Sequence, residues 1–352
     1  MKETLFDAVV IGAGPAGVSA ALDLMRGGAR IAVIDRQAFP RQKACAGGLS
    51  DGTLRLLKYD PAPAIRVQVS AMQVSHCFNQ PVTAVAQRPV FAMTRRSEFD
   101  ELGFRAVEAT GCPLFICPGP HTVTQDAQRV TIRYRDFTLH SRYVVAADGA
   151  GSPTRRQLIH ENTRLQALSI EADVDAEHVF ADAAAPTWVD FGVVPGGYAW
   201  VFPKGDHVNV GLYTSSSRFA AGINRRNLYA YANKVLGTQR LTEIRGFPLG
   251  IDCTGSRMSS GRALFAGDAG GFAHAHTGEG IYGAVLTGQL VAAAILADLD
   301  VAQTYRQSAA RMLSRCRLAR VLSKPLYGSL SLTYPLFARY ISSQVDKAGK
   351  RT

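Results

Sequence analysis

Apolar and polar positions near the N-terminus predict three short elements. Residues 6–11 (Phe-Asp-Ala-Val-Val-Ile) form a β-prone apolar run, and residues 18–25 place apolar side chains at helical spacing. A second β-prone run over residues 30–34 ends at Asp35. The pattern therefore predicts a strand, a helix and a second strand, the βαβ unit of an α/β fold.

A glycine-rich turn joins the first predicted strand to the helix. Gly12, Gly14 and Gly17 have the spacing Gly-x-Gly-x-x-Gly in the strand-to-helix context that dinucleotide binding requires. The first glycine permits the tight turn, the second lets the backbone approach a pyrophosphate, and the third allows close helix packing. The helix N-terminus offers N–H groups to the phosphates. Asp35, 23 residues after Gly12, is placed to accept hydrogen bonds from a ribose.

Two later segments also lead from a predicted strand into a glycine turn. They contain Asp148-Gly149 and Gly267-Asp268. A dehydrogenase that binds only NAD needs one glycine fingerprint and no late acid, whereas a second acid suits the ribityl chain of a longer flavin dinucleotide. The pattern therefore favours a flavin.

The longest uncharged run extends from Gly280 to Ala297 and reaches the minimum length of a membrane span. It is rich in alanine and glycine and follows a glycine turn, so we expect a buried helix and no transmembrane segment. Between residues 190 and 213, alternating apolar residues predict two or three antiparallel strands. Residues 198–202 place three aromatic rings on one strand face, which suits either core packing or the wall of an apolar substrate pocket.

Composition indicates a folded protein of about two domains, and the charge is concentrated at one end. The 352 residues are 47% hydrophobic and 19% charged, which excludes a disordered or collagen-like chain. The net charge is +11, but residues 301–352 hold ten Lys and Arg residues and one acid, so this tail carries +9. We therefore expect no nucleic acid as partner. The tail predicts either a helix that covers the sheet domain or a docking element for a membrane or protein partner.

The cysteines indicate that the protein lies in a reducing compartment and has no metal site. The six cysteines show no paired metal-ligand spacing: Cys45, Cys77, Cys112, Cys117, Cys253 and Cys316. We expect a cytoplasmic protein, peripheral to the inner face of the membrane if the tail docks there.

Several further blocks of sequence share a resemblance. Residues 41–49 are Arg-Gln-Lys-Ala-Cys-Ala-Gly-Gly-Leu, residues 96–100 are Arg-Ser-Glu-Phe-Asp, and residues 197–206 are Gly-Tyr-Ala-Trp-Val-Phe-Pro-Lys-Gly-Asp. With Gly267-Asp268 and residues 277–281, these blocks resemble the geranylgeranyl reductase family of flavoproteins, which have the p-hydroxybenzoate-hydroxylase-like fold. The sequence departs from the family pattern at Ala46, where glycine is usual, and at Ala275, where proline is common.

The resemblance implies an α/β (α+β) fold in which a Rossmann-like FAD-binding domain is interleaved with an antiparallel β-sheet substrate domain, with a helical C-terminus. The domains are expected at residues 1–68, 93–163 and 255–300 for FAD, 69–92 and 164–254 for the substrate, and 301–352 for the basic helical segment.

The resemblance also implies FAD as cofactor and a set of residues around it. Arg96 would face the flavin or the phosphate chain, and its neighbour Arg95 is a nearly equal candidate. The turn before Ile281 would stabilise negative charge on the flavin, or would merely let the following helix pack. The candidate FAD-binding residues are Gly12, Gly14, Ala16, Gly17, Asp35, Arg36, Arg41, Cys45, Ala46, Arg96, Asp148, Gly267, Asp268, Gly278, Gly280 and Ile281.

Four residues are candidates for the chemistry. Cys45 would lie beside the flavin ring, unless it is an inert buried cysteine. Tyr198 and Trp200 would form the pocket wall, and His276, with His274 as second choice, would donate or accept protons unless it is structural. No metal is expected.

These features predict an FAD-dependent oxidoreductase that acts on a small apolar substrate. The favoured reaction reduces a carbon–carbon double bond in an isoprenoid or lipid quinone. One alternative is a flavin-dependent monooxygenase that hydroxylates an aromatic group on a small molecule or partner protein, and another is a non-catalytic flavoprotein that docks to a membrane or partner. With no second glycine fingerprint, electrons would come from transiently bound NAD(P)H or from an external donor. The oligomeric state stays open.

Overall fold

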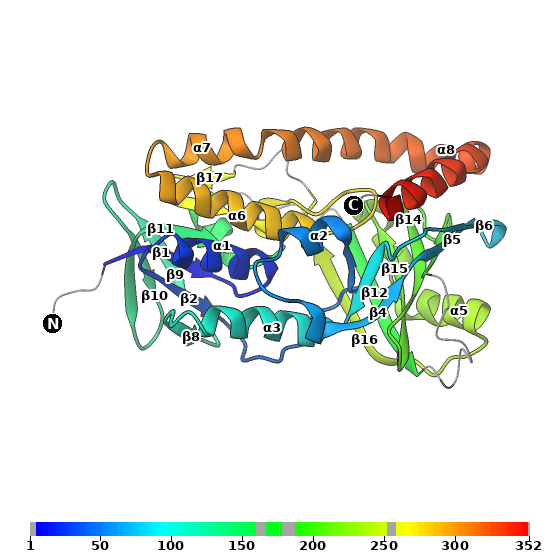
Figure 1. The fold of residues 1–352 in the computed structure, drawn as a ribbon, viewed down its shortest axis with the longest axis horizontal. Coiled ribbons are helices and arrows are strands. Elements are labelled where there is room, and N and C mark those ends of the chain that lie inside the picture. The colour runs from blue at the N-terminus through cyan, green and yellow to red at the C-terminus, as the bar shows by residue number, and fades with distance from the viewer. Residues whose placement is uncertain (1–4, 160–166, 176, 178–186, 252–257, 351–352) are drawn as a thin grey trace.

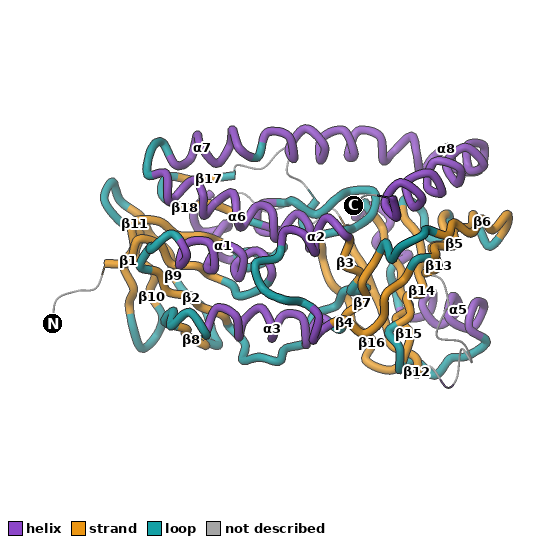
Figure 2. The backbone as a smooth tube through the Cα atoms, in the orientation of Figure 1, coloured by secondary structure: helices purple, strands orange, loops and turns teal. Residues whose placement is uncertain are grey.

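The protein contains two large β-sheets with a small sheet between them (Figure 2). The computed structural model describes residues 5–159, 167–175, 177, 187–251 and 258–350. Cys253 and Arg351, which the charge and cysteine patterns included, lie outside the described residues.

The first sheet contains the predicted βαβ unit, formed by β1 (Leu5–Ile11), α1 (Pro15–Arg26) and β2 (Ile31–Asp35). Strand β1 lies between β2 and β11 (Thr138–Ala146) and is parallel to both. The sheet order is β17-β18-β11-β1-β2-β8, with β10 and β9 added beside β11. The bounds of the remaining strands are β8 (Leu114–Ile116), β9 (Thr122–Gln125), β10 (Val130–Arg133), β17 (Ser259–Ser260) and β18 (Ala263–Phe265).

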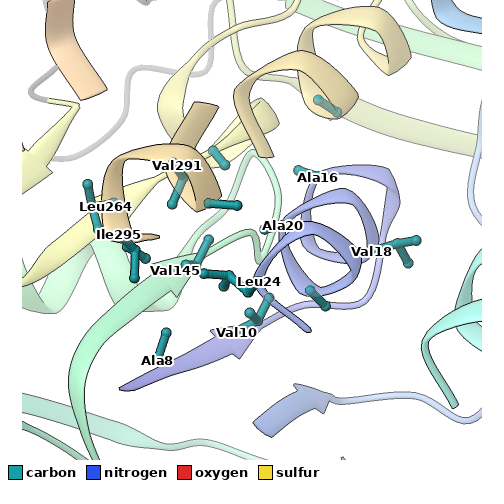
Figure 3. Packing of buried hydrophobic residues seen from close by; sticks show 14 of the residues in the cluster. Ala8, Val10, Ala16, Val18, Ala20, Leu24, Val145, Leu264, Val291 and Ile295 are labelled. Carbon is teal, nitrogen blue, oxygen red and sulfur yellow. The ribbon is translucent and has the colours of Figure 1, made fainter. Parts of the chain in front are cut away.

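Helix α6 (Ile281–Ala297) is the buried helix that the uncharged run predicts. It packs against α1 so closely that a Cβ at Gly288 would lie 2.2 Å from the Ala16 carbonyl oxygen. Small side chains on both helices permit this approach, and Val291 and Ile295 complete the core with residues of α1 and β1 (Figure 3). Among the residues that the structure describes, no helix is both long enough and apolar enough to cross a membrane.

Short elements connect the two large sheets. A three-stranded sheet has the order β3-β7-β4, and the short helix η4 follows β18. The elements of this region are β3 (Gly48–Ser50), α2 (Asp51–Leu56), η1 (Ala62–Ala64), β4 (Ile65–Val69), β7 (Phe91–Thr94), α3 (Arg96–Glu108), α4 (Pro153–Ile159) and η4 (Gly267–Gly270).

The second large sheet has seven strands in the order β16-β12-β15-β14-β13-β5-β6. It includes the strands predicted between residues 190 and 213. One pair, β13 and β5, is parallel, because the β5–β6 hairpin enters from an early part of the chain. The bounds are β5 (Ala71–His76), β6 (Asn79–Val85), β12 (Ala167–Asp175), β13 (Thr187–Phe191), β14 (Gly197–Pro203), β15 (His207–Thr214) and β16 (Thr242–Leu249).

Side chains alternate between the two faces of this sheet, as the pleat requires. The even-numbered residues of β12 and β15 pack against α5 (Arg225–Leu236), which follows the short helix η3 (Ser217–Gly222). The opposite face points toward the first sheet and the C-terminal helix, so the functional cavity lies on that side.

The C-terminal segment is helical, as predicted, and consists of α7 (Val301–Ser308) and α8 (Ala310–Lys350). Helix α8 runs along one side of the molecule and turns back over β5 and β6 (Figure 1). It contains Pro325 and Pro335, which lack the backbone N–H that an unbent helix needs. Its second half is anchored to the sheet, because the Tyr334 hydroxyl donates a hydrogen bond to the Val74 carbonyl at 2.7 Å.

Candidate functional site

A cavity of about 1880 Å³ runs from the glycine turn after β1 to α8. At one end it meets the carboxyl ends of the parallel strands β1, β2 and β11, where open α/β sheets bind ligands. In the middle it passes the loop formed by residues 41–48, and at the other end it is lined by the seven-stranded sheet and α8.

The glycine turn is held in place from two sides. The Asp35 carboxylate accepts a hydrogen bond from the Ala13 backbone N–H at 2.8 Å. A Cβ at Gly17 would lie 1.8 Å from the Gly12 carbonyl oxygen, so no side chain fits there. At Gly14, in contrast, a Cβ would have only the Arg41 guanidinium within 4 Å, at 3.4 Å. The turn is therefore closed toward the protein and open toward the cavity.

Two arginines bring positive charge to this end of the cavity. The Arg96 guanidinium forms hydrogen bonds of 2.9 to 3.1 Å with Asp100, and Arg41 approaches the same carboxylate to 3.3 Å. The Arg41 Nε atom is buried and has no hydrogen-bond partner. A donor on a cavity wall that makes no hydrogen bond, such as this N–H group, is suited to an oxygen of an anionic ligand such as a phosphate.

The neighbouring Arg95 points elsewhere. It donates to Asp206 at 3.0 Å and lies 3.0 Å from the His207 ring, beside a second, polar pocket. Of the two arginines that the sequence analysis offered, Arg96 lines the large cavity and Arg95 does not.

The remaining predicted FAD-binding residues all border the same cavity: Ala16, Arg36, Cys45, Ala46, Asp148, Gly267, Asp268, Gly278, Gly280 and Ile281. Asp148 also has a structural task, because it accepts hydrogen bonds from the Ser152 hydroxyl and the Thr154 backbone N–H at the start of α4. The glycine turn, Asp35 and the Arg41 Nε atom, which makes no hydrogen bond and lies 3.9 Å from the Asp35 carboxylate, together fit a dinucleotide with its sugar and its phosphates.

Residues 45–47 form a tightly constrained loop beside the cavity. Gly47 has φ of +64°, and a Cβ there would lie 2.1 Å from the Thr94 carbonyl oxygen. The Cys45 N–H donates to Glu171 at 2.9 Å, and the Lys204 ammonium donates to the Ala46 carbonyl oxygen. Ala46 does not have a positive φ, so the alanine that departs from the family pattern is accommodated without strain.

A buried polar cluster behind this loop was not predicted from the sequence. It contains Glu171 and Asp173 of β12, Lys204 after β14, and Arg245 of β16, which lies 2.8 Å from Asp173 and 3.6 Å from Glu171. Burial raises the pKa of Glu171 to about 7, against the lowering effects of the Cys45 N–H and Arg245. Burial also lowers the pKa of Lys204 to about 8. Polar residues at period two in β12 were a signal for this cluster.

The predicted aromatic residues line the cavity from β14. The ring centroids of Tyr198 and Trp200 are 6.1 Å apart, and those of Trp200 and Phe202 are 6.4 Å apart. The Trp200 indole N–H donates to Asn209 at 2.8 Å, so its polar atom is satisfied within the protein. The Tyr198 hydroxyl donates to the Thr277 carbonyl oxygen, which connects this wall to the turn before α6.

The two histidines lie in that turn. Burial, followed by the neighbouring His274, lowers the pKa of His276 to about 4. The His276 ring is therefore neutral at pH 7, and its buried Nδ1 atom has no hydrogen-bond partner. The Tyr327 hydroxyl of α8 donates to the His276 carbonyl oxygen at 2.6 Å.

Glu279 lies in the same turn and was not among the residues predicted for the site. Its carboxylate accepts a hydrogen bond from the Ser50 hydroxyl at 2.9 Å, and burial raises its pKa. Within the described part of the chain, no three His, Cys, Asp or Glu side chains come together in a way that could hold a metal ion.

Comparisons with known proteins agree with this geometry. Residues 6–299 match the family model described as "FAD binding domain". The menaquinone reductase of Mycobacterium tuberculosis is 29% identical over an alignment of 359 residues, gaps included, and the alignment covers 94% of this chain and 85% of that protein. Digeranylgeranylglycerophospholipid reductase 1 of Methanothermobacter thermautotrophicus is 28% identical over 319 residues, covering 83% and 78% respectively.

A solved structure has the same fold. A geranylgeranyl bacteriochlorophyll reductase-like protein from Thermoplasma acidophilum superimposes with a TM-score of 0.78 at 20% sequence identity. The match covers 99% of this chain and 93% of that chain.

Proposed function

We propose that this chain, which belongs to the FAD-binding domain family, reduces a carbon–carbon double bond in an apolar substrate of isoprenoid character. The family membership confirms the predicted resemblance, fold class and cofactor. The chain is an FAD-dependent oxidoreductase. The choice of reaction and substrate is our proposal.

The observation that carries the proposal is the part of the cavity farthest from the glycine turn, which we call the apolar arm. It is continuous with the cofactor end of the cavity, and the residues that we assign to it are all uncharged, whereas Arg315 of α8 lines the cavity outside this set. An apolar chamber suits a prenyl chain, which has no polar groups along its length to satisfy. The residues of the apolar arm are Met72, Val74, Val189, Phe191, Phe202, Leu326, Tyr327, Phe337 and Ile341.

Relatives support the same substrate class. Two curated relatives have names that describe the reduction of a menaquinone and of a digeranylgeranylglycerophospholipid. Each of the two alignments covers more than four-fifths of this chain.

Different residues at the cofactor end of the cavity would hold different parts of FAD. The turn at Gly14 and the guanidinium of Arg41 would hold the pyrophosphate, and Asp35 would hold the ribose. When bound, FAD supplies the hydride chemistry that a double-bond reduction needs. The aromatic rings of Tyr198 and Trp200 line the cavity where this end meets the apolar arm, and they would help to keep water away from a bound substrate.

Reduction of a double bond also consumes one proton, and Glu171 is suited to hold it. Its pKa of about 7 is close to the optimum for a carboxyl group that must both release and regain a proton near neutral pH. Glu171 lines the large cavity and also a second pocket of about 270 Å³ on the far side of the Cys45 loop. His276 is less suited as an acid, because a pKa of about 4 leaves it neutral at pH 7.

The test is a single turnover of the FAD-loaded protein, reduced anaerobically with a stoichiometric amount of dithionite and mixed with geranylgeranyl diphosphate. Dithionite makes the test independent of the physiological donor, for which NAD(P)H and another protein are both candidates. We expect reoxidation of the flavin without oxygen and a product heavier by two hydrogens in mass spectrometry. Reoxidation that requires oxygen, with a hydroxylated product, would overturn the reductase proposal in favour of a monooxygenase.

A variant tests the apolar arm separately. Phe337→Glu places a charge in the arm, and we expect KM for a prenyl substrate to rise by about tenfold or more, because a buried charge must be desolvated. The matched control is Val85→Glu on the exposed side of β6, where 69% of the valine is accessible. Unchanged FAD content in both variants shows that the fold is retained.

A further inference from the structure

The outer side of α8 exposes several large apolar side chains. In the first half of the helix these are Leu318, Val321 and Leu322, with 59%, 71% and 47% exposure. In the second half they are Leu332, Leu336 and Tyr340, with 85%, 68% and 58% exposure. The spacings of three and four residues place each set on one side of its helical segment. We call these six residues the α8 apolar patch.

Positive charge surrounds the α8 apolar patch. Among the residues of α8 whose side chains the structure describes, the exposed basic ones are Arg311, Arg315 and Arg317, which precede the first half of the patch, Arg339, which lies within the second half, and Lys347, which follows it. Asp346 is the one acidic residue in the sequence of α8. Apolar and basic side chains on the same helix are the composition of a segment that lies in the interface of an anionic bilayer.

The cavity opens within this patch. Leu318, Leu322, Leu336 and Tyr340 are exposed to solvent and also line the cavity that contains the apolar arm. The helix that presents the patch therefore also forms the mouth of the cavity. In Figure 1, α8 lies along the outside of the molecule and bends back over the second sheet, so its outer side is not covered by another element.

We propose that the α8 apolar patch docks onto the surface of an anionic phospholipid bilayer and opens the cavity directly into the lipid. The leucines and Tyr340 enter the interface, while the surrounding arginines and Lys347 contact lipid phosphates. A lipid-soluble molecule would then pass between the bilayer and the apolar arm without crossing water.

Other occupants of the patch fit the observations less well. A second copy of the chain seated on the same face would bring two clusters of like charge together, which disfavours association. Nucleic acid would match the charge but would leave the exposed leucines without an apolar partner. A bilayer of anionic lipid satisfies both the charge and the apolar surface.

The experiment measures cosedimentation of the full-length, FAD-loaded protein with vesicles, without any substrate. One set of vesicles contains phosphatidylcholine with phosphatidylglycerol, and the other contains phosphatidylcholine alone. We expect binding to the anionic vesicles, weaker binding at high salt and little binding to the neutral ones. Equal binding to both sets of vesicles, or to neither, would overturn the proposal.

Two variants and two controls locate the surface. Leu332→Glu combined with Leu336→Glu, and Arg311→Gln combined with Arg317→Gln and Arg339→Gln, should each weaken binding by about tenfold or more. The controls are Val85→Glu and Arg135→Gln, which alter an exposed residue of β6 outside α8 and an exposed arginine between β10 and β11, and should bind as the unaltered protein does. If the variants bind as tightly as the controls, α8 is not the docking surface.

Light scattering measures the oligomeric state and so tests whether a second copy of the chain covers the α8 apolar patch. A dimer that dissociates in the Leu332→Glu and Leu336→Glu variant would show that a second copy covers the patch, and would overturn membrane docking. Because the binding assay contains no substrate, its failure leaves the proposed reduction untouched. Failure of the single-turnover test likewise leaves the docking surface untouched.

Discussion

Replacing Glu171 by glutamine removes a charge from the polar cluster behind the Cys45 loop while keeping the shape of the side chain. Glu171 is buried, and its carboxylate accepts the Cys45 N–H and lies near Arg245. Glutamine can still accept the Cys45 N–H through its amide oxygen. Arg245 keeps its contacts with Asp173 and Glu243, so the substitution leaves no arginine without a partner.

The size of the effect follows from the pKa of the group. Burial raises the pKa of Glu171 from its ordinary value of 4.5 to about 7 in the folded protein. The folded state therefore binds more protons than the unfolded state in this range, and stability falls as the pH rises from about 4.5 to about 7. At 1.36 kcal/mol for each pKa unit, this shift corresponds to a loss of about 3 kcal/mol. Glu171→Gln removes the loss, because its side chain stays neutral.

Urea unfolding of the unaltered protein and the variant over a pH series measures this difference. The two free energies of unfolding should converge toward about pH 4 and differ by about 3 kcal/mol at about pH 8, with the variant more stable. Glu243→Gln is the matched control, because Glu243 pairs with the same arginine but its side chain is 53% exposed. The control should follow the unaltered protein. If Glu171→Gln keeps the pH dependence of the unaltered protein, Glu171 is not the buried titrating group.

Two further substitutions test how the cofactor end is built. Gly47→Ala should reduce the FAD retained through gel filtration, measured by flavin absorbance, because the new Cβ would lie 2.1 Å from the Thr94 carbonyl oxygen. Gly48→Ala, whose Cβ would have no neighbour closer than 3.6 Å, should retain FAD, and equal loss in both variants would contradict the steric argument. Thr287→Val should lower the free energy of unfolding in urea by about 1 to 3 kcal/mol, because the buried Gly267 N–H loses the hydroxyl that accepts it at 2.9 Å. Thr287→Ser restores the acceptor and should recover most of the loss, whereas equal destabilisation by both would exclude the hydrogen bond as the cause.

The sequence pattern was sufficient to predict elements that are formed by residues close together in the chain. The βαβ unit and α6 could be predicted, because strand and helix periods and the glycine turn are all encoded in adjacent residues. The distinction between Arg95 and Arg96 was also within reach. Asp100 lies four residues after Arg96, on the same side of α3, and an i,i+4 pair of this kind can hold the arginine inward.

Contacts between distant parts of the chain could not be predicted from the sequence. Cys45 and Glu171 are 126 residues apart, and their hydrogen bond depends on the register of β12 in a sheet whose strand order no local pattern reveals. The alternation in β12 shows that Glu171 shares a face with Asp173, but not that this face is buried. The course of α8 through Pro325 and Pro335 is a similar case, because packing against β5 and β6 outweighs the local preference.

The strand order of the second sheet explains how a charged cluster and an apolar chamber can share one cavity. Along the face that points to the cavity, β12 contributes Glu171, β14 contributes Trp200, and β13 and β5 contribute Val189 and Val74. Polarity therefore decreases across the sheet from β12 to β5, and the aromatic wall lies between the two ends. A proton would be held at the polar edge of the sheet and the hydrocarbon chain of a substrate at the apolar edge, with the reacting double bond between them. Each can then be desolvated without burying the charge against the hydrocarbon, which would otherwise raise the cost of binding either one.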